Sequence, residues 1–168
     1  TNLTDITFES GLEKIPNYLF IDCTWISSVE IPEGVTEIGS GVFNGCTSLK
    51  TVKLPESVLT LGTSTFFDCT SLDTINLPDA LTKIGNYTFK GCVKLAEADL
   101  PSGLKTMGTN AFEGCTSLTS IEIPKSLTTI ENGSSGSPFE GCTNLTEITF
   151  ESGLERIPNY LFVDNPLM

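Results

Sequence analysis

The sequence predicts a β-rich solenoid in which each turn supplies one short strand to a parallel sheet. A 23-residue pattern recurs along the chain, apolar residues return at fixed positions within it, and phenylalanine occupies position 20 of every turn. Self-similarity at a period of roughly 20 to 50 residues is the sequence signature of repeat architectures. We therefore expect one domain over residues 1–168 with seven turns, at 1–23, 24–46, 47–69, 70–92, 93–115, 116–142 and 143–165.

Positions 3, 6 and 8 of each turn are apolar, and positions 5 and 7 are polar. The fourth turn shows this pattern with Leu72, Ile75 and Leu77. Alternation of apolar and polar residues is the period of a half-buried strand. Neighbouring strands of a sheet lie about 4.8 Å apart, so equivalent side chains of successive turns should form rows.

Proline follows the strand at position 9 in five turns and should end it, because proline lacks the N–H that a ladder needs. A second apolar pair comes at positions 12 and 15, such as Leu81 and Ile84. Glycine is next in four turns, where it suits a tight corner. The prolines are Pro32, Pro55, Pro78, Pro101 and Pro124, and the glycines are Gly39, Gly62, Gly85 and Gly108.

The phenylalanines at position 20 predict a stacked aromatic spine inside the coil, on the side opposite the sheet. The segment around each one is too short for an α-helix, so a turn or a 3₁₀ segment is expected there. The seven residues are Phe20, Phe43, Phe66, Phe89, Phe112, Phe139 and Phe162.

Leu72-x-x-Ile75-x-Leu77 fits the L-x-x-L-x-L strand segment of leucine-rich repeats. The full run LxxIxLPxxLxxIGxxxFxxC resembles the BspA-like, or Treponema-type, leucine-rich repeats over essentially the whole chain. This resemblance implies a leucine-rich-repeat solenoid: a right-handed superhelix of the α/β type, mostly β, with a parallel concave sheet and short 3₁₀ or irregular convex segments. It also implies a cell-surface or secreted protein of a bacterium or a protozoan, which binds host, matrix or other cell-surface proteins.

The first and last turns are one variant of the repeat, since residues 1–23 and 143–165 agree at 19 of 23 positions. Both carry proline in place of the corner glycine, at Pro16 and Pro158. We infer a larger module that begins again at Thr143, so the chain is expected to be a fragment of a longer tandem array. Apolar surface and unpaired strand edges at its two ends predict end-to-end self-association.

The charge balance excludes two classes of partner. The chain has 21 acidic residues against 9 basic ones and no histidine, for a net charge of −12. Such a surface repels nucleic-acid phosphates and anionic membranes. No apolar run reaches the roughly 18 to 20 residues that a membrane span needs. Neither nucleic-acid binding nor membrane insertion is expected.

The six cysteines close successive turns, one per turn, without the C-x-x-C spacing of a metal site. The last turn has Asn165 in the same place, which is also small and able to bond to the backbone. The pattern favours a buried ladder of free thiols over disulfides between adjacent turns or a metal site. The cysteines are Cys23, Cys46, Cys69, Cys92, Cys115 and Cys142.

The outward side chains at strand positions 5 and 7 form what we call the concave face, the surface that solenoids commonly use for binding. Its N-terminal half is mainly hydroxyl and amide groups, whereas its C-terminal half gathers carboxylates. Such a face is either a solvated surface without a task, or a site for a basic partner or a divalent cation. The candidate protein-binding residues are Glu30, Lys53, Asn76, Glu97, Asp99, Glu122 and Glu147.

Trp25, the only tryptophan, is an eighth candidate at position 2 of its turn. A lone exposed tryptophan either anchors a partner or packs on the loop of a neighbouring turn. The 27-residue turn contains a Gly/Ser run within residues 131–138, which predicts a flexible loop.

Asp99 and Glu122 make the strongest case for catalysis, because a strand spacing of about 5 Å matches the carboxylate separation of retaining glycosidases. That half of the face lacks a basic group to tune the pair and an aromatic platform for a sugar, and no nucleophile elbow, P-loop or dinucleotide motif occurs. We predict no enzyme, and no catalytic, cofactor or metal site. Three functions remain: a protein-binding, adhesin-like module, a structural spacer without a ligand, and a carbohydrate- or cation-binding groove.

Overall fold

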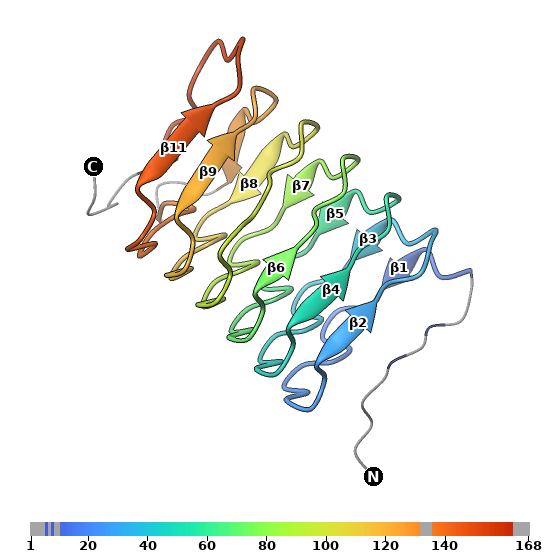
Figure 1. Ribbon diagram of the computed structural model, residues 1–168. Coiled ribbons are helices and arrows are strands. Elements are labelled where there is room, and N and C mark those ends of the chain that lie inside the picture. The colour runs from blue at the N-terminus through green and yellow to red at the C-terminus, as the bar shows by residue number, and fades with distance from the viewer. Residues whose placement is uncertain (1–5, 7, 9–10, 132–135, 163–168) are drawn as a thin grey trace.

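The computed structural model describes residues 6, 8, 11–131 and 136–162, and these residues form a parallel β-solenoid (Figure 1). Each turn stacks on the one before it, so residues 23 positions apart in the sequence lie side by side on paired strands. The described residues contain eleven strands and no helix. The solenoid predicted from the repeat is confirmed.

Strand positions 5 to 8 form the sheet beneath the concave face, as the alternating pattern predicts. The first three of these strands make one parallel sheet, and the last two make a separate parallel pair. The apolar residue at position 6 points inward, as Val29 and Val52 do, and its neighbours point to solvent. The strands are β2 (Ser28–Glu30), β4 (Thr51–Lys53) and β6 (Thr74–Ile75), then β9 (Ser120–Ile123) and β11 (Glu147–Phe150).

A second parallel sheet of six strands runs along the other side of the coil, behind the first in Figure 1. The sequence pattern does not predict it, because strands of two or three residues are too short to show an alternation. Its inward residues are the apolar ones at position 15, such as the fully buried Ile38 and Ile84. The strands are β1 (Lys14–Ile15), β3 (Glu37–Ile38), β5 (Thr60–Leu61), β7 (Lys83–Ile84), β8 (Thr106–Gly108) and β10 (Thr129–Glu131).

Position 16 joins successive turns of this second sheet. The N–H of Gly39 donates to the carbonyl of Ile15 at 3.0 Å. One turn later, the N–H of Gly62 donates to the carbonyl of Ile38 at 2.9 Å. A Cβ on Gly62 would lie 2.6 Å from the backbone nitrogen of Ser40, so only glycine allows this approach. In these inner turns position 16 therefore combines the small size of glycine with a backbone donor, whereas the sixth turn has Glu131 there, paired with Gly108.

The aromatic spine is confirmed. Ring centroids of successive phenylalanines from Phe20 to Phe162 lie 5.0–5.6 Å apart, with ring planes within 22° of parallel. The described segments around these rings are turns, with no 3₁₀ segment among them. Each turn is closed by a bond such as that from the N–H of Cys46 to the carbonyl of Phe43, at 3.1 Å.

Candidate functional site

The seven candidates on the concave face all project from one side of the coil, over shallow hollows. Glu30 and Lys53 lie in β2 and β4, and Asn76 follows β6 directly. Two hollows cover this N-terminal half, with volumes of about 340 and 540 Å³. Both are lined by the polar residues of positions 5 and 7 and floored by residues such as Val52. The face is thus uneven rather than flat.

The charges of the N-terminal half are paired with each other. Lys53 Nζ lies 2.5 Å from Glu30 Oε1. The hydrogen bond from Glu30, and then its negative charge, raise the pKa of Lys53 above its ordinary value. Both side chains are largely exposed, so water screens the pair and it adds little to stability. The pair itself therefore presents no net charge to a partner, although Glu56 and Asp79 also line the larger of the two hollows.

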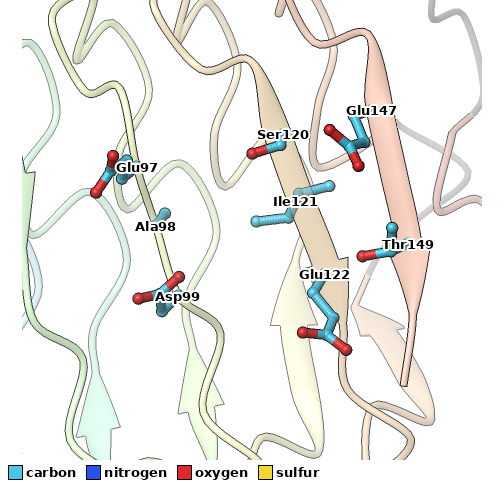
Figure 2. A pocket seen from close by; sticks show the side chains of 8 residues that line it. All are labelled: Glu97, Ala98, Asp99, Ser120, Ile121, Glu122, Glu147 and Thr149. Carbon is cyan, nitrogen blue, oxygen red and sulfur yellow. The ribbon is translucent and has the colours of Figure 1, made fainter. Parts of the chain in front are cut away.

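The C-terminal half contains what we call the acidic hollow, a depression of about 300 Å³. Four carboxylates line it, and no lysine or arginine does (Figure 2). The registered pairing of β9 with β11 places Ser120 beside Glu147 and Glu122 beside Thr149. The lining residues are Glu97, Ala98, Asp99, Ser120, Ile121, Glu122, Glu147 and Thr149.

The fifth turn crosses the acidic hollow without forming a strand, which sequence reasoning missed. Glu97 and Asp99 lie on an extended segment that joins neither β6 nor β9 (Figure 2). Ala98 takes the inward place that Val or Ile fills in the other turns, so this segment buries less apolar surface. Asp99 and Glu122 occupy position 7 of neighbouring turns, where like charges disfavour pairing.

The chemistry available to the hollow is ionic. Among the residues that the structure describes, no group of three or more His, Cys, Asp or Glu side chains is arranged to hold a metal ion. All four carboxylates are exposed to solvent. The hollow therefore offers several negative charges to whatever approaches the C-terminal half of the face.

The thiol ladder predicted from the cysteines is confirmed in the described turns. All six cysteines are free, and the five from Cys46 to Cys142 are buried. Each of these five thiols donates to the carbonyl of the spine phenylalanine of the preceding turn, at 3.0–3.2 Å. Burial raises the pKa of Cys46 and of Cys142 to about 12. Such thiols are poor nucleophiles. Asn165 lies outside the described residues.

Trp25 lies apart from the concave face. It precedes β2, is 39% exposed, and lines none of the hollows described above. The structure therefore does not combine it with the other seven candidates. Its role as an anchor stays a prediction.

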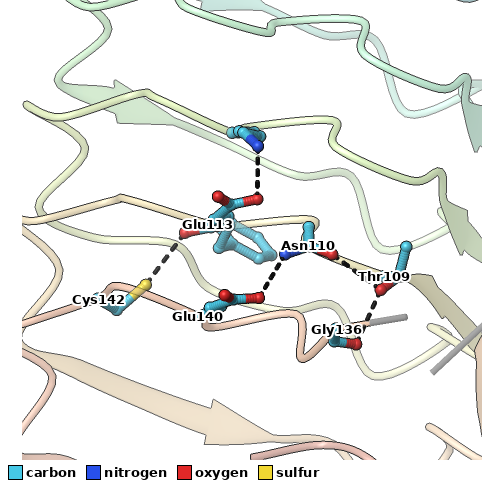
Figure 3. A network of polar contacts seen from close by, with 8 residues as sticks. Thr109, Asn110, Glu113, Gly136, Glu140 and Cys142 are labelled. Carbon is cyan, nitrogen blue, oxygen red and sulfur yellow. Dashed lines mark hydrogen bonds and ion pairs between the residues drawn. The ribbon is translucent and has the colours of Figure 1, made fainter. Parts of the chain in front are cut away.

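A polar network on the phenylalanine side of the coil has no signal in the repeat pattern (Figure 3). Thr109 Oγ1 donates to the carbonyl of Gly136 at 2.8 Å. Asn110 Nδ2 donates to Glu140 Oε2 at 2.8 Å, and Asn110 itself is 5% exposed. These bonds fasten the end of the Gly/Ser run at Gly136 and the residue Glu140 that follows it. Residues 132–135 of that run lie outside the described residues, so the flexible loop stays a prediction.

Comparison with known proteins places the chain among bacterial repeat proteins. The family description "BspA type Leucine rich repeat region", in 6 copies, matches residues 1–115 and 36–168. None of the curated proteins matches. A leucine rich repeat protein of Treponema pallidum is 32% identical over 85% of this chain and 67% of its own, with a TM-score of 0.78.

Two further solved structures share the fold. A leucine rich cell surface protein of Faecalibacterium prausnitzii is 29% identical over 89% of this chain and 46% of its own, with a TM-score of 0.59. The pneumococcal vaccine antigen PcpA is 26% identical over 78% of this chain and 32% of its own, with a TM-score of 0.64. The chain spans less than half the length of these two proteins. Within its described residues, no helix has the length and apolar character to cross a membrane.

Proposed function

Because this chain belongs to the BspA-type leucine-rich repeat family, we propose that it is a protein-binding module of an adhesin-like protein that is displayed at the cell surface or secreted. The module acts without catalysis and takes its partner on the concave face. Support for a surface location comes from the family and from the Faecalibacterium prausnitzii relative, which is itself described as a cell surface protein. The partners we propose are host, matrix or other cell-surface proteins.

The acidic hollow is the observation that carries this proposal. Its four carboxylates have no basic residue in the lining, whereas Glu30 and Lys53 on the other half neutralise each other. A partner with a cluster of lysines or arginines supplies the missing charge. Complementary charge of this kind increases the rate and the specificity of association more than the affinity.

The composition of the hollow also limits the strength of binding. No aromatic side chain lines it, and aromatic residues are the usual anchors of tight interfaces. The carboxylates come from three successive turns, so the complementary surface should be spread out rather than a single deep contact. We therefore expect moderate affinity that falls steeply as salt is added.

The test is a binding screen of the full chain against host, matrix and cell-surface proteins, followed by titration of each positive partner at low and high salt. A triple variant with Glu97→Gln, Asp99→Asn and Glu122→Gln should bind about tenfold more weakly or worse, with a shallower salt dependence. The matched control carries Glu13→Gln, Glu33→Gln and Asp73→Asn, all exposed and outside the acidic hollow.

The control removes the same charge and should keep its affinity. Full binding by the hollow variant would exclude the acidic hollow as the site. Equal losses in both variants would show that only net charge matters, which also contradicts a defined site.

A structural spacer without a ligand of its own is the second candidate. The continuous phenylalanine stack and the thiol ladder favour it, because they give the coil one uninterrupted core. A screen in which no protein binds would support the spacer. Glycans and divalent cations included in the same screen test the carbohydrate- or cation-binding groove.

A further inference from the structure

The concave side of the coil opens between the fifth and sixth turns. Elsewhere a backbone bond at position 4 links each turn to the one before it, as the N–H of Lys50 donates to the carbonyl of Ser27 at 2.9 Å. The N–H of Thr146 donates in the same way to Thr119 at 3.0 Å, and the two junctions around the fourth turn keep the bond at 3.3 and 3.4 Å. Among the residues that the structure describes, only Thr119 and Ala96, at the junction of the fifth and sixth turns, lack it.

The same two turns are in regular contact on the other sides of the coil. On the second sheet, β8 pairs with β10, and Thr106 lies opposite Thr129. On the phenylalanine side, the N–H of Phe112 donates to the carbonyl of Pro138 at 2.8 Å. The rings of Phe112 and Phe139 stack there at 5.5 Å. The opening is therefore local, and its cause must act on the concave side.

The outward side chains supply that cause. In the described strands of the concave face, registered outward residues never carry the same charge: Glu30 faces Lys53, and each carboxylate of β9 and β11 faces a hydroxyl. At the open junction, Asp99 and Glu122 occupy position 7 of neighbouring turns (Figure 2). Like charges directly opposite each other destabilise strand pairing. The registered pairs of β9 and β11 are Ser120 with Glu147 and Glu122 with Thr149.

The small side chain of Ala98 does not account for the place of the opening. Ala98 borders the fourth turn on one side and the sixth on the other, so it weakens strand pairing towards both. Towards the fourth turn, however, the N–H of Ala96 still donates to the carbonyl of Asp73 at 3.3 Å. Position 7 of the fourth turn is the uncharged Asn76. The position-4 bond is thus lost only where Asp99 meets a second carboxylate.

We propose that this junction is a charge-controlled switch within the acidic hollow. It stays open while Asp99 faces Glu122, and it closes when a cationic group of a basic partner lies between the two carboxylates. The pair of Lys53 and Glu30, whose Nζ and Oε1 atoms lie 2.5 Å apart across a registered strand pair, is the precedent for the closed arrangement. The closing step rests on the function proposed above, whereas the opening needs no partner.

Closure gives the sixth turn the bond that the other junctions have, from the N–H of Thr119 to the carbonyl of Ala96. A cation favours the closed state because it is attracted to both carboxylates, and these lie nearer to it there. By linkage, a partner that closes the junction binds more tightly to a chain in which the junction is already closed. Strand pairing and partner binding are therefore coupled at one place on the face.

The first test measures solvent exchange of backbone amides in the full chain by nuclear magnetic resonance. In the wild type, the amide of Thr119 should be less protected than that of Lys50. Asp99→Asn should raise the protection of Thr119 by about two- to fivefold, because it removes the like-charge pair. Asp99→Lys should raise it further, because it creates an opposite-charge pair. Glu147→Gln is the matched control, since it removes the same charge from the same hollow but faces Ser120.

The control should leave the Thr119 amide as it is in the wild type. The amide of Thr146, which is bonded to the sixth turn, reports whether each variant remains folded there. A wild-type Thr119 amide as protected as that of Lys50 would show that the junction is closed. Unchanged protection in both Asp99 variants, or an equal rise in Glu147→Gln, would overturn the control by charge.

The second test uses hexalysine as the cationic partner. Bound hexalysine should raise the protection of the Thr119 amide in the wild type and cause no further rise in the Asp99→Lys variant. Binding without any change at Thr119 would overturn the switch and leave the basic partner of the proposed function in place. An absence of binding would contradict both the basic partner and the closing step, while the substitution series still decides whether like charges open the junction.

Discussion

The first and last turns have nearly the same sequence but differ in which of their side chains are buried. Ile15 is buried and Ile157 is exposed, whereas Leu19 is 46% exposed and Leu161 only 2%. The side chain at position 15 is covered by the following turn, and the one at position 19 by the preceding turn. A repeat sequence therefore determines which surfaces a turn offers, and its neighbours determine which of them become core.

Proline at position 16 explains why strands also differ between these turns. In the first turn, β1 pairs only with the following turn, where the carbonyl of Ile15 accepts a hydrogen bond from Gly39. Pro16 does not have to donate a hydrogen bond there, so β1 forms. Pro158 would have to donate to the preceding turn, which it cannot do, and the described residues of the second sheet end at β10. Proline at position 16 is therefore compatible with the first strand of the second sheet, but it prevents a further strand in the last turn.

The largest expected effect is on the pH dependence of stability, and it should differ between the thiols of the inner turns and the thiol of Cys23 at the end of the coil. Burial raises the pKa of Cys69, Cys92 and Cys115 above the ordinary value of 9.0. Unfolded thiols ionise above that pH and folded ones do not. The contribution of these neutral thiols to the free energy of unfolding is therefore fully present below pH 9. Above pH 9 it decreases by about 1.4 kcal/mol per pH unit for each fully buried thiol.

Urea unfolding at several values of pH from 7 to the alkaline range measures this loss. Cys92→Ala should reduce the slope of stability against pH by one proton. Cys23→Ala should reduce it less, because Cys23 is only partly buried. Equal slopes for the two variants would contradict the difference in burial.

The next effect contrasts position 16 in an inner turn with position 16 at the end. A Cβ on Gly85 would lie 2.6 Å from the backbone of Gly62, so Gly85→Ala should destabilise the protein by about 3 kcal/mol. Pro16→Ala, at an exposed residue, should change stability by less than about 0.5 kcal/mol. Chemical denaturation of both variants checks the pair, and a tolerated Gly85→Ala would show that the turns are less tightly stacked.

The two isoleucines provide a smaller contrast of the same kind. Ile15→Ala should cost about 2 kcal/mol, because it leaves a cavity beneath β3. Ile157→Ala should cost less than about 0.5 kcal/mol in the monomer. Chemical denaturation gives both values. A large loss for Ile157→Ala would mean that its side chain is covered in solution.

The smallest effect concerns the ion pair of the concave face. Glu30→Gln should leave the urea midpoint unchanged within error, because both partners are largely exposed. The same variant should lower the pKa of Lys53, which Glu30 raises. Nuclear magnetic resonance titration of the lysine side chain measures that change, and an unaltered pKa would contradict the hydrogen bond.

Much of the fold could be predicted because the repeat samples each position several times. Phe89 and Ile75 are recognisable as core since every turn has a counterpart. The second sheet was missed, because Lys83 and Ile84 alone show no alternation. The absence of a strand at Ala98 was not predicted either, because alanine still fits an apolar position. A pattern averaged over turns conceals what one turn lacks.

The candidate site was also only partly predictable from the sequence. The alternation placed Glu97, Asp99, Glu122 and Glu147 on one face, and the structure brings them into one hollow. Trp25 was grouped with them by exposure alone, and it lies elsewhere. The network of Asn110 and Glu140 joins residues on either side of the long turn, where the regular period gives no register, so sequence spacing could not reveal it.

In mechanical terms, the unpaired segment at Glu97–Asp99 leaves the fifth turn without strand pairing on the concave side of the described coil. On the concave side no ladder crosses it, whereas on the other side β7, β8 and β10 pair without interruption. A rod that is bonded along one edge and open along the other bends towards or away from the open edge. Bending there changes the width of the acidic hollow while the continuous sheet acts as the hinge line.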